Sequence, residues 1–87
     1  MRKISISEQV ERFLRTLAPV PKHAVRLAIS RLAYGDDGTK ALGGELAGYR
    51  RVTWGKYRVV YLSNANSVEC IHAGVRKTVY KEFKPRN

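Results

Sequence analysis

The sequence predicts an α+β fold in which an N-terminal strand and a helical hairpin are followed by a small, mainly antiparallel sheet, in the order β-α-α-β-β-β. Two stretches with helical spacing of apolar residues come before residue 35, and segments with alternating apolar residues come after residue 48. Neither predicted helix is long enough to be stable alone in water, so both must pack on one face of the sheet. The 87 residues allow one modest core, and residues 1–87 are expected to form a single domain.

Spacing and a capping residue predict the first strand and the first helix. Ile4 and Ile6 alternate with polar residues, which favours a short strand near the N-terminus. Ser7 is suited to cap a helix, and acidic residues follow in the first turn, where the helix dipole favours them. The apolar face of this helix is formed by Val10, Phe13, Leu14 and Leu17.

Prolines separate this helix from the next one. Residues 19–21, which contain two prolines, are expected to form a tight connector, because proline cannot continue the first helix. A second helix is predicted from about Lys22 to Tyr34, and Gly35 with a turn at 36–38 ends it. Its inward face is expected to contain Val25, Ala28, Ile29 and Leu32.

The sheet is predicted to begin after a linker at residues 40–48, which leucine side chains anchor. Two short strands then meet at a two-residue turn, Gly55-Lys56. In the first strand, Arg51 and Trp54 lie on opposite faces. The second strand is mostly apolar on both faces, with Arg58 as the exception, as for an inner strand that is covered on one side and partly occluded on the other. The sheet is therefore expected to present cations to something outside the protein.

A third strand of the meander is predicted over residues 68–73, after a turn rich in asparagine and serine. Within it, Cys70 and His72 share one face at a spacing of two residues. Gly74 is expected to break the pattern, so that residues 75–80 run past the edge of the sheet.

The net charge limits the classes of partner. Seventeen lysines and arginines against seven acidic residues give +10. A small chain with this imbalance attracts polyanions, above all nucleic acid or an acidic partner protein. Basic residues dominate most strongly over residues 50–87, so the strand-rich half is expected to face the polyanion. A merely solvated basic surface is the alternative.

The cysteine content and the hydropathy predict a compartment. A single cysteine, Cys70, excludes an internal disulfide and is typical of a reducing environment. No apolar run approaches membrane-spanning length, and the N-terminus lacks the apolar core of a signal peptide. The protein is therefore expected in the cytoplasm and without a membrane partner.

The sequence lacks the motifs of several enzyme classes. It contains no glycine-rich phosphate loop. Cys70 and His72 are two potential metal ligands without a second pair, so neither a metal nor another cofactor is expected. The arginines of the predicted strands can converge, and arginine binds phosphate bidentately; a solvated sheet face is the alternative for each. The remaining candidates are Arg51, Lys56, Arg58, Arg76, Lys77 and Tyr80.

Two motifs resemble the RelE/ParE toxin superfamily. Residues 46–61, LAGYRRVTWGKYRVVY, are similar to its core motif: leucine, x, glycine, an arginine-rich strand, then glycine, x, tyrosine, arginine, two aliphatic residues and tyrosine. Residues 73–80, AGVRKTVY, are similar to its closing motif, in which glycine, x, arginine is followed by valine and tyrosine. The N-terminal strand and helical hairpin agree as well, so the resemblance covers nearly the whole chain.

The resemblance implies a toxin of the RelE branch, which enters the ribosomal A site and cuts messenger RNA there. The 2′-hydroxyl of the messenger attacks the adjacent phosphate, and basic residues on the sheet stabilise the developing charge. The implied partners are the ribosome, messenger RNA and a cognate antitoxin protein. Carried over by position, the implied catalytic residues are Arg51, Arg58, Arg76 and Tyr80. The residues expected to bind RNA are Lys56, Lys77, Lys81 and, in a supporting role on the other face of its strand, Arg50.

Two positions depart from the family pattern. Thr53 stands where many active members carry a second basic residue, and Val75 stands where many carry histidine. A ParE-like inhibitor of DNA gyrase, which would not need the four catalytic residues in one site, is therefore the first alternative. A non-catalytic RNA-binding module is the second. The presence of all four catalytic candidates favours the nuclease.

Overall fold

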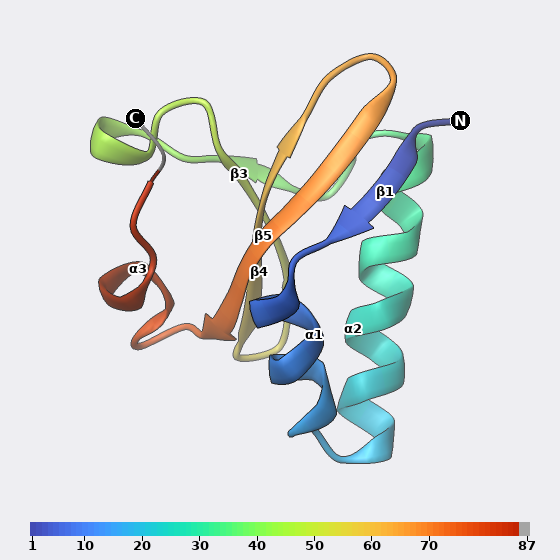
Figure 1. Cartoon of the computed structure of the whole chain (residues 1–87), viewed down its shortest axis with the longest axis vertical. Helices are drawn as coiled ribbons and strands as arrows, with labels where there is room; N and C mark the ends of the chain where they lie inside the picture. Colours follow the sequence, from blue (N-terminus) through green and yellow to red (C-terminus); the bar gives the residue numbers. More distant parts are fainter. Residues whose placement is uncertain (86–87) are drawn as a thin grey trace.

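In the computed structural model, which describes residues 1–85, the strands form one mixed sheet in the order β1-β5-β4-β3-β2 (Figure 1). β1 pairs with β5 in parallel, and the other neighbouring strands are antiparallel. The predicted α+β class, with its N-terminal strand, helical hairpin and mainly antiparallel sheet, is confirmed. The strands are β1 (Lys3–Ile6), β2 (Lys40–Ala41), β3 (Arg50–Trp54), β4 (Tyr57–Ser63) and β5 (Ser67–Val75).

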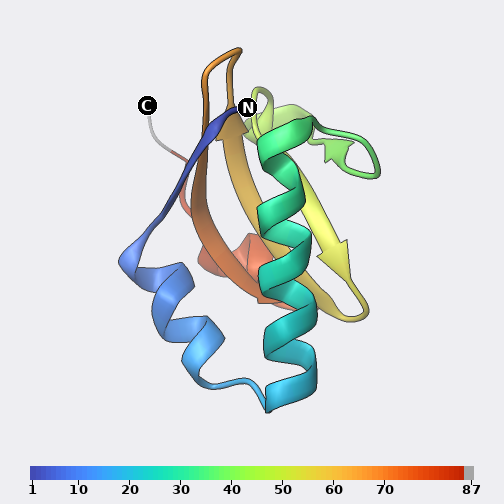
Figure 2. The same ribbon diagram turned by 90° about the vertical axis from the view of Figure 1, so that its right-hand side faces the viewer.

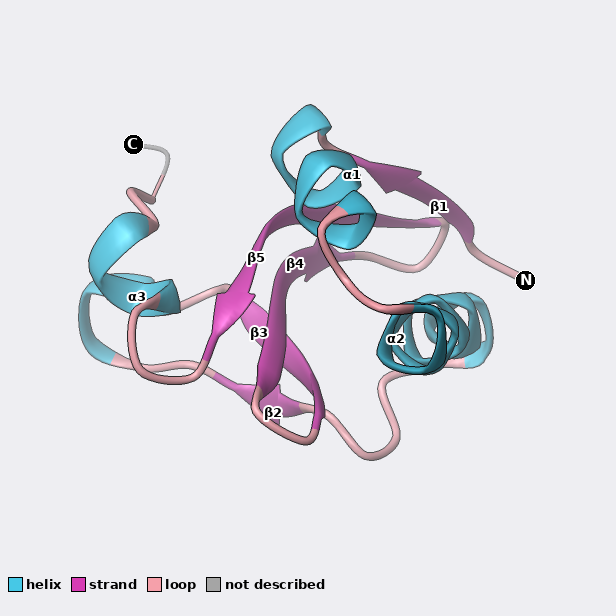
Figure 3. Cartoon of the chain, turned by 90° about the horizontal axis from the view of Figure 1, so that it is seen from below, coloured by secondary structure: helices cyan, strands magenta, loops and turns pink. Residues whose placement is uncertain are grey.

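The two long helices carry the chain from one edge of the sheet to the other. α1 (Glu8–Arg15) packs on β5 and α2 (Pro19–Arg31) packs on β3, so both cover the same face, as Figure 2 shows. Three short helical segments follow: η1 (Leu32–Tyr34), η2 (Gly44–Leu46) and α3 (Val79–Glu82). Figure 3 shows α3 on the side of the sheet away from α1 and α2.

The main core lies between the helical hairpin and the sheet. The apolar faces predicted for both helices contribute to it, and Ser7 caps α1 as expected, because its side chain accepts a hydrogen bond from the Val10 N–H at 3.2 Å. The buried members of this cluster are Val10, Leu14, Val25, Ile29, Leu32, Val52, Val59, Tyr61, Val68, Cys70 and Ala73.

The prolines at residues 19–21 do not form a connector, because α2 already begins at Pro19. The first-turn N–H groups of a helix have no partner within the helix, so a proline there loses nothing, and its fixed φ suits the helix. The predicted end of α2 is closer to the structure: α2 ends at Arg31, η1 continues to Tyr34, and Gly35 stops the helix with a φ of 146°.

The expected linker at 40–48 contains two short elements. Lys40 and Ala41 pair with β3 as the edge strand β2, and η2 follows. Both strand residues are exposed, so no alternation of apolar residues marks them in the sequence. The leucines at 42 and 46 are half-buried and pack against a second cluster on the face away from α1 and α2.

Strand β5 does not break at Gly74, since it continues to Val75 and Gly74 itself pairs with Arg58 of β4. A β-bulge also interrupts this pairing, because Tyr61 lies opposite Cys70 while Val60 lies opposite His72. Cys70 therefore lies in the core under the helices, whereas His72 lies on the opposite face. The predicted common face of Cys70 and His72 is wrong, because a bulge inserts one residue and resets the alternation.

Side chains from the start of α1 complete the hydrogen bonding of β5 where β1 ends. The Ser7 hydroxyl donates to the carbonyl oxygen of Ile71 at 2.7 Å. The Gln9 side-chain amide donates to the Ala73 carbonyl and accepts from the Ala73 N–H, each at 2.8 Å. Gln9 thus replaces a neighbouring strand for one residue, at a position that is buried in the core.

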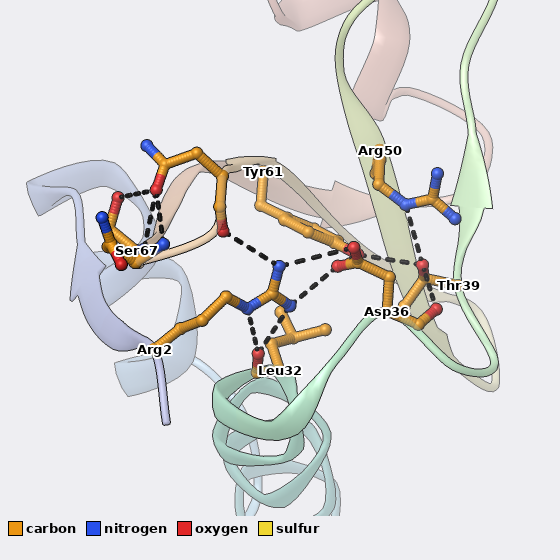
Figure 4. Close-up of polar contacts among 9 residues, drawn as sticks. Arg2, Leu32, Asp36, Thr39, Arg50, Tyr61 and Ser67 are labelled. Atoms are coloured by element: carbon orange, nitrogen blue, oxygen red, sulfur yellow. Dashed lines mark hydrogen bonds and ion pairs between the residues drawn. The ribbon is translucent and has the colours of Figure 1, made fainter.

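A polar network fixes the other end of the molecule (Figure 4). The Arg2 guanidinium donates to the Leu32 carbonyl at the end of α2 and pairs with Asp36 at 2.9 Å. The Tyr61 hydroxyl donates to the Asp36 carboxylate at 2.9 Å. The hydrogen bond from Arg2, followed by that from Tyr61, holds the pKa of Asp36 below its ordinary value. The network joins the N-terminus, the end of α2 and the central strand.

Gln9→Leu is expected to lower the free energy of unfolding by about 2 kcal/mol, because the N–H and C=O of Ala73 both lose their partner. Urea unfolding followed by circular dichroism measures this, with Arg12→Ala on the exposed side of the same helix as the control. A loss in Gln9→Leu no larger than in the control would contradict the assignment.

Asp36→Asn is expected to cost about 1 kcal/mol of stability at neutral pH, because the ion pair with Arg2 is lost. The folded pKa of Asp36 lies below the unfolded value, so its contribution is complete above the unfolded pKa and is lost as pH falls through the folded pKa. The difference from wild type in urea unfolding should therefore shrink with acidification. The neighbouring, exposed Asp37→Asn removes the same charge without breaking the ion pair, and its stability at neutral pH should match that of wild type.

Candidate functional site

A second apolar cluster lies on the face of the sheet away from α1 and α2, and arginine side chains lie on the same face. Its buried members are Tyr49, Val60, Val79 and Phe83, with the Tyr49 and Phe83 rings edge to face at a centroid distance of 5.1 Å. Val79 and Phe83 come from α3 and its C-terminal end, so this segment folds back over the sheet. Arg51 of β3 and Arg58 of β4 lie on the same face as this cluster.

Arg58 is the most buried of the predicted site residues, with 8% of its surface exposed. Its Nη1 donates to the carbonyl oxygens of Gly55 at 2.7 Å and Tyr57 at 3.1 Å. Its Nε is buried and has no hydrogen-bond partner among the described residues. Burial lowers the pKa of Arg58, and the neighbouring positive charges of Arg51 and Arg76 lower it further. A guanidinium remains charged even so, and no carboxylate among residues 1–85 pairs with this one.

Arg51 and Tyr80 meet beside Arg58. Arg51 lies on β3 opposite Val60, on the same face as Arg58, and its Nη1 donates to the Tyr80 hydroxyl at 3.3 Å. Tyr80 comes from α3, which brings it back over the sheet from a point 29 residues further along the chain. The structure therefore brings Arg51, Arg58 and Tyr80 together on one face of the sheet.

Arg76 lies at the end of β5, in the turn that leads to α3. Its N–H donates to the Lys56 carbonyl at 2.7 Å, which ties this turn to the β3–β4 turn. Its charge acts on Arg58, so it belongs to the same electrostatic group, but its side chain is exposed. Lys56, Val75, Arg76 and Lys77 line a hollow of about 240 Å³ at this end of the sheet.

Two of the residues expected to bind RNA lie apart from this group. Arg50 points to the face that α1 and α2 cover, where its Nε donates to the Thr39 hydroxyl at 3.1 Å (Figure 4). It is therefore part of the network around Asp36 and is separated from Arg51 by the sheet. Lys81 is exposed on α3, and no contact with the arginines is recorded for it.

The charge of the site is uncompensated within the described residues. The ion pairs recorded for residues 1–85 are Arg2–Asp36 and Arg26–Glu11, and no carboxylate pairs with Arg51, Arg58 or Arg76. Clustered guanidinium groups without counter-charges attract an external anion, and their planar geometry suits a phosphate. The arrangement can therefore bind a phosphodiester and stabilise additional negative charge on it.

Cys70 and His72, two potential metal ligands of β5, lie on opposite faces of the sheet. Within residues 1–85, no group of three potential ligands among histidine, cysteine, aspartate and glutamate comes together. Burial raises the pKa of the Cys70 thiol to about 12, so the thiolate form is suppressed at neutral pH. His72 lies under Phe83, with ring centroids 5.5 Å apart, and burial lowers its pKa. Within the same residues, no helix is both long and apolar enough to span a bilayer.

The helix that carries Tyr80 was not predicted, because residues 75–80 were expected to extend past the sheet edge. The available signal was the pair Val79 and Phe83, whose spacing of four residues places both on one side of a helical turn. Gly74 was a second signal, because α3 packs directly on it. A Cβ at Gly74 would lie 3.3 Å from the Val79 side chain.

Solved structures match this chain, whereas no protein-family model and no curated protein does. In a RelBE2 toxin–antitoxin complex from Mycobacterium tuberculosis, a matching chain is 25% identical with a TM-score of 0.73, covering 86% of this chain and 91% of that one. A chain of the RelE–RelB complex from Pyrococcus horikoshii is 21% identical with a TM-score of 0.73, and the match covers 86% of this chain and 94% of that one. YafQ from E. coli is 13% identical with a TM-score of 0.66, and the match covers 90% of this chain and 97% of that one. These matches confirm the resemblance that the two motifs predicted.

Gly74→Val is expected to displace α3, because the added side chain overlaps Val79, and to cost about 1 to 3 kcal/mol. Amide NMR shifts measure this, with changes expected over β5 and α3 together with loss of the Arg51–Tyr80 contact. Gly43→Val is the matched control, since nothing lies within 4 Å of a Cβ there. Unchanged α3 resonances in Gly74→Val would contradict this packing.

Proposed function

We propose that this chain, whose fold places it in the RelE-like toxin superfamily, is the toxin of a toxin–antitoxin pair and cuts messenger RNA on the ribosome. The structural neighbours are RelE and YafQ toxins, which supports a toxin role. The observation that carries the nuclease assignment is the group of Arg51, Arg58, Arg76 and Tyr80. Arg51 and Arg58 lie beside the Tyr80 phenol on one face of the sheet, and Arg76 lies at the end of β5, close enough for its charge to act on Arg58. Within residues 1–85, no carboxylate pairs with any of the three guanidinium groups.

The proposed reaction uses the substrate's own nucleophile. The ribose 2′-oxygen attacks the adjacent phosphorus, so a 2′-O–P bond forms while the bond from phosphorus to the 5′-oxygen of the next nucleotide breaks. The 2′-hydroxyl loses its proton and the departing 5′-oxygen gains one. The products are a 2′,3′-cyclic phosphate and a 5′-hydroxyl. The step requires no oxidant or reductant, because the phosphorus keeps its oxidation state.

The arginines are assigned to charge stabilisation. Negative charge on the non-bridging phosphate oxygens grows as the attacking oxygen bonds to phosphorus, and a cation helps the rate only where it binds this state more strongly than the ground state. Arg58 is held by the carbonyls of its own turn, so its guanidinium is oriented before the substrate binds. Arg76, exposed at the end of β5, is free to move onto the phosphate.

Tyr80 is assigned one of two roles: it transfers a proton to the leaving oxygen, or its ring stacks on the base of the nucleotide. Its hydroxyl accepts a hydrogen bond from Arg51, which fixes the ring on α3 relative to the arginines. A phenol in this position can pass a proton to the leaving oxygen, and its ring can stack on a base. Arg51 therefore has two proposed roles: it binds the phosphate and it orients Tyr80.

An acidic antitoxin is the proposed partner of this +10 chain. Three of the structural neighbours are RelB–RelE antitoxin–toxin complexes, which supports such a partner. Complementary charge speeds capture, and an acidic segment laid over the arginines would neutralise the site by occupying the position of the phosphate.

The test is an in vitro translation reaction in which primer extension maps the ends of the message. Wild type is expected to cut within codons in the A site and to leave naked RNA intact. Arg76→Ala and Arg51→Ala are expected to cut about 100-fold more slowly, because each removes a cation that stabilises the transition state. Tyr80→Phe separates the two roles of Tyr80, since it keeps the ring and removes the hydroxyl.

Arg15→Ala is the matched control, because it removes one exposed positive charge from α1, on the other side of the sheet, and should cut like wild type. An intact message with undisturbed translation would contradict the nuclease. A supercoiling assay would then test inhibition of DNA gyrase.

A further inference from the structure

An exposed tryptophan stands at the tip of the β3–β4 hairpin. Trp54 is the single tryptophan of the chain and keeps 42% of its surface exposed. Its ring is parallel to that of Tyr57, with an interplanar angle of 3° and centroids 6.3 Å apart. Directly stacked rings approach to about 3.5–4.0 Å, so these two rings are offset. Part of the indole face is therefore not covered by Tyr57.

Aromatic rings on the core side of Trp54 hold its indole in place. Tyr57 packs edge to face on Phe13 of α1, with centroids 6.0 Å apart, and both side chains lie against the main core. Phe13, Tyr57 and Trp54 thus form a row of rings from the core to the surface. A rigid aromatic ring that is already ordered loses little entropy when a second flat group stacks on it.

Positively charged side chains lie at the same end of the sheet as Trp54. The Nζ of Lys56 lies 5.6 Å from the centre of the Tyr57 ring, within the turn that joins Trp54 to Tyr57. The N–H of Arg76 bonds the carbonyl of Lys56, so the hollow lined by Lys56, Arg76 and Lys77 is tied to the hairpin tip. An aromatic face next to a cationic hollow matches the two requirements for single-stranded nucleic acid, stacking for a base and positive charge for the backbone.

We propose that Trp54 is a base-stacking residue for single-stranded RNA, whose backbone phosphate lies in the hollow formed by Lys56, Arg76 and Lys77. The inference rests on the proposed function in one respect, namely that RNA is the substrate. It adds a second contact region at the end of the sheet, beyond the group of Arg51, Arg58 and Tyr80. The RNA then bends around the hairpin tip from the arginine face to the indole.

The intrinsic fluorescence of Trp54 tests the contact directly, because selective excitation of tryptophan reports on this position alone. Titration of the full chain with a short single-stranded RNA is expected to quench the emission. An abasic oligonucleotide of the same length keeps the phosphates and lacks the bases, so it should bind through the cations without quenching. Equal quenching by both oligonucleotides would overturn the proposal.

Anisotropy of a labelled RNA measures the affinity of variants. Trp54→Ala is expected to bind about five- to 100-fold more weakly, and Trp54→Phe should retain part of the affinity because it keeps an aromatic face. Tyr34→Ala is the matched control, since Tyr34 is 81% exposed and lies in η1, at the other end of α2 from the α1–α2 connection. Circular dichroism verifies the fold of each variant. RNA affinity in Trp54→Ala equal to that of wild type would overturn the proposal.

The translation assay distinguishes the proposed stacking site from the proposed nuclease activity. Trp54→Ala is expected to cut the message more slowly than both wild type and Tyr34→Ala. A wild-type chain that is quenched by RNA but leaves the message intact would contradict the nuclease and support the stacking site. A Trp54→Ala chain that cuts the same codons at the wild-type rate would overturn the stacking site and leave the nuclease standing.

Discussion

The burial of a charged residue in the central strand is the constraint around which the candidate site is built. β4 places four consecutive buried residues between two apolar clusters, and Arg58 is one of them. A guanidinium in that position must keep hydrogen bonds, because an unpaired buried charge is costly. The turn at Gly55 supplies carbonyl oxygens for Nη1, and Nε stays without a partner. The site thus has a buried, hydrogen-bonded cation at its centre and more exposed cations around it.

The elements with a long periodic signal could be predicted from the sequence. The Ser7 cap, the apolar faces of the first two helices and the three-stranded meander agree with the structure, because the same side chains that set the pattern form the core. The start of α2 at Pro19 was missed, since proline was interpreted as a break although the first turn of a helix accepts it. β2 was missed because its two residues are exposed and carry no pattern.

The members of the candidate site remain predictions, and their arrangement could be predicted only in part. Arg51, Arg58 and Tyr80 do converge, yet they do so because α3 folds back over the sheet, and this depends on packing between residues far apart in the chain. The separation of His72 from Cys70 likewise depends on a bulge, which no local pattern indicates. Arg50 shows the opposite case, since simple alternation already placed it on the other face of β3.

The parallel pairing of β1 with β5 has a consequence for the order in which the fold is completed. Ser7 and Gln9 bond residues 64 positions later in the chain, so the edge of the sheet closes only after β5 has been synthesised. Contacts between such distant residues slow folding, because a long loop must close before they form. Arg76 and Tyr80 follow β5 in the chain and are synthesised after it. Tyr80 reaches Arg51 only when α3 folds back over the finished sheet, so the arginine face is assembled late in folding.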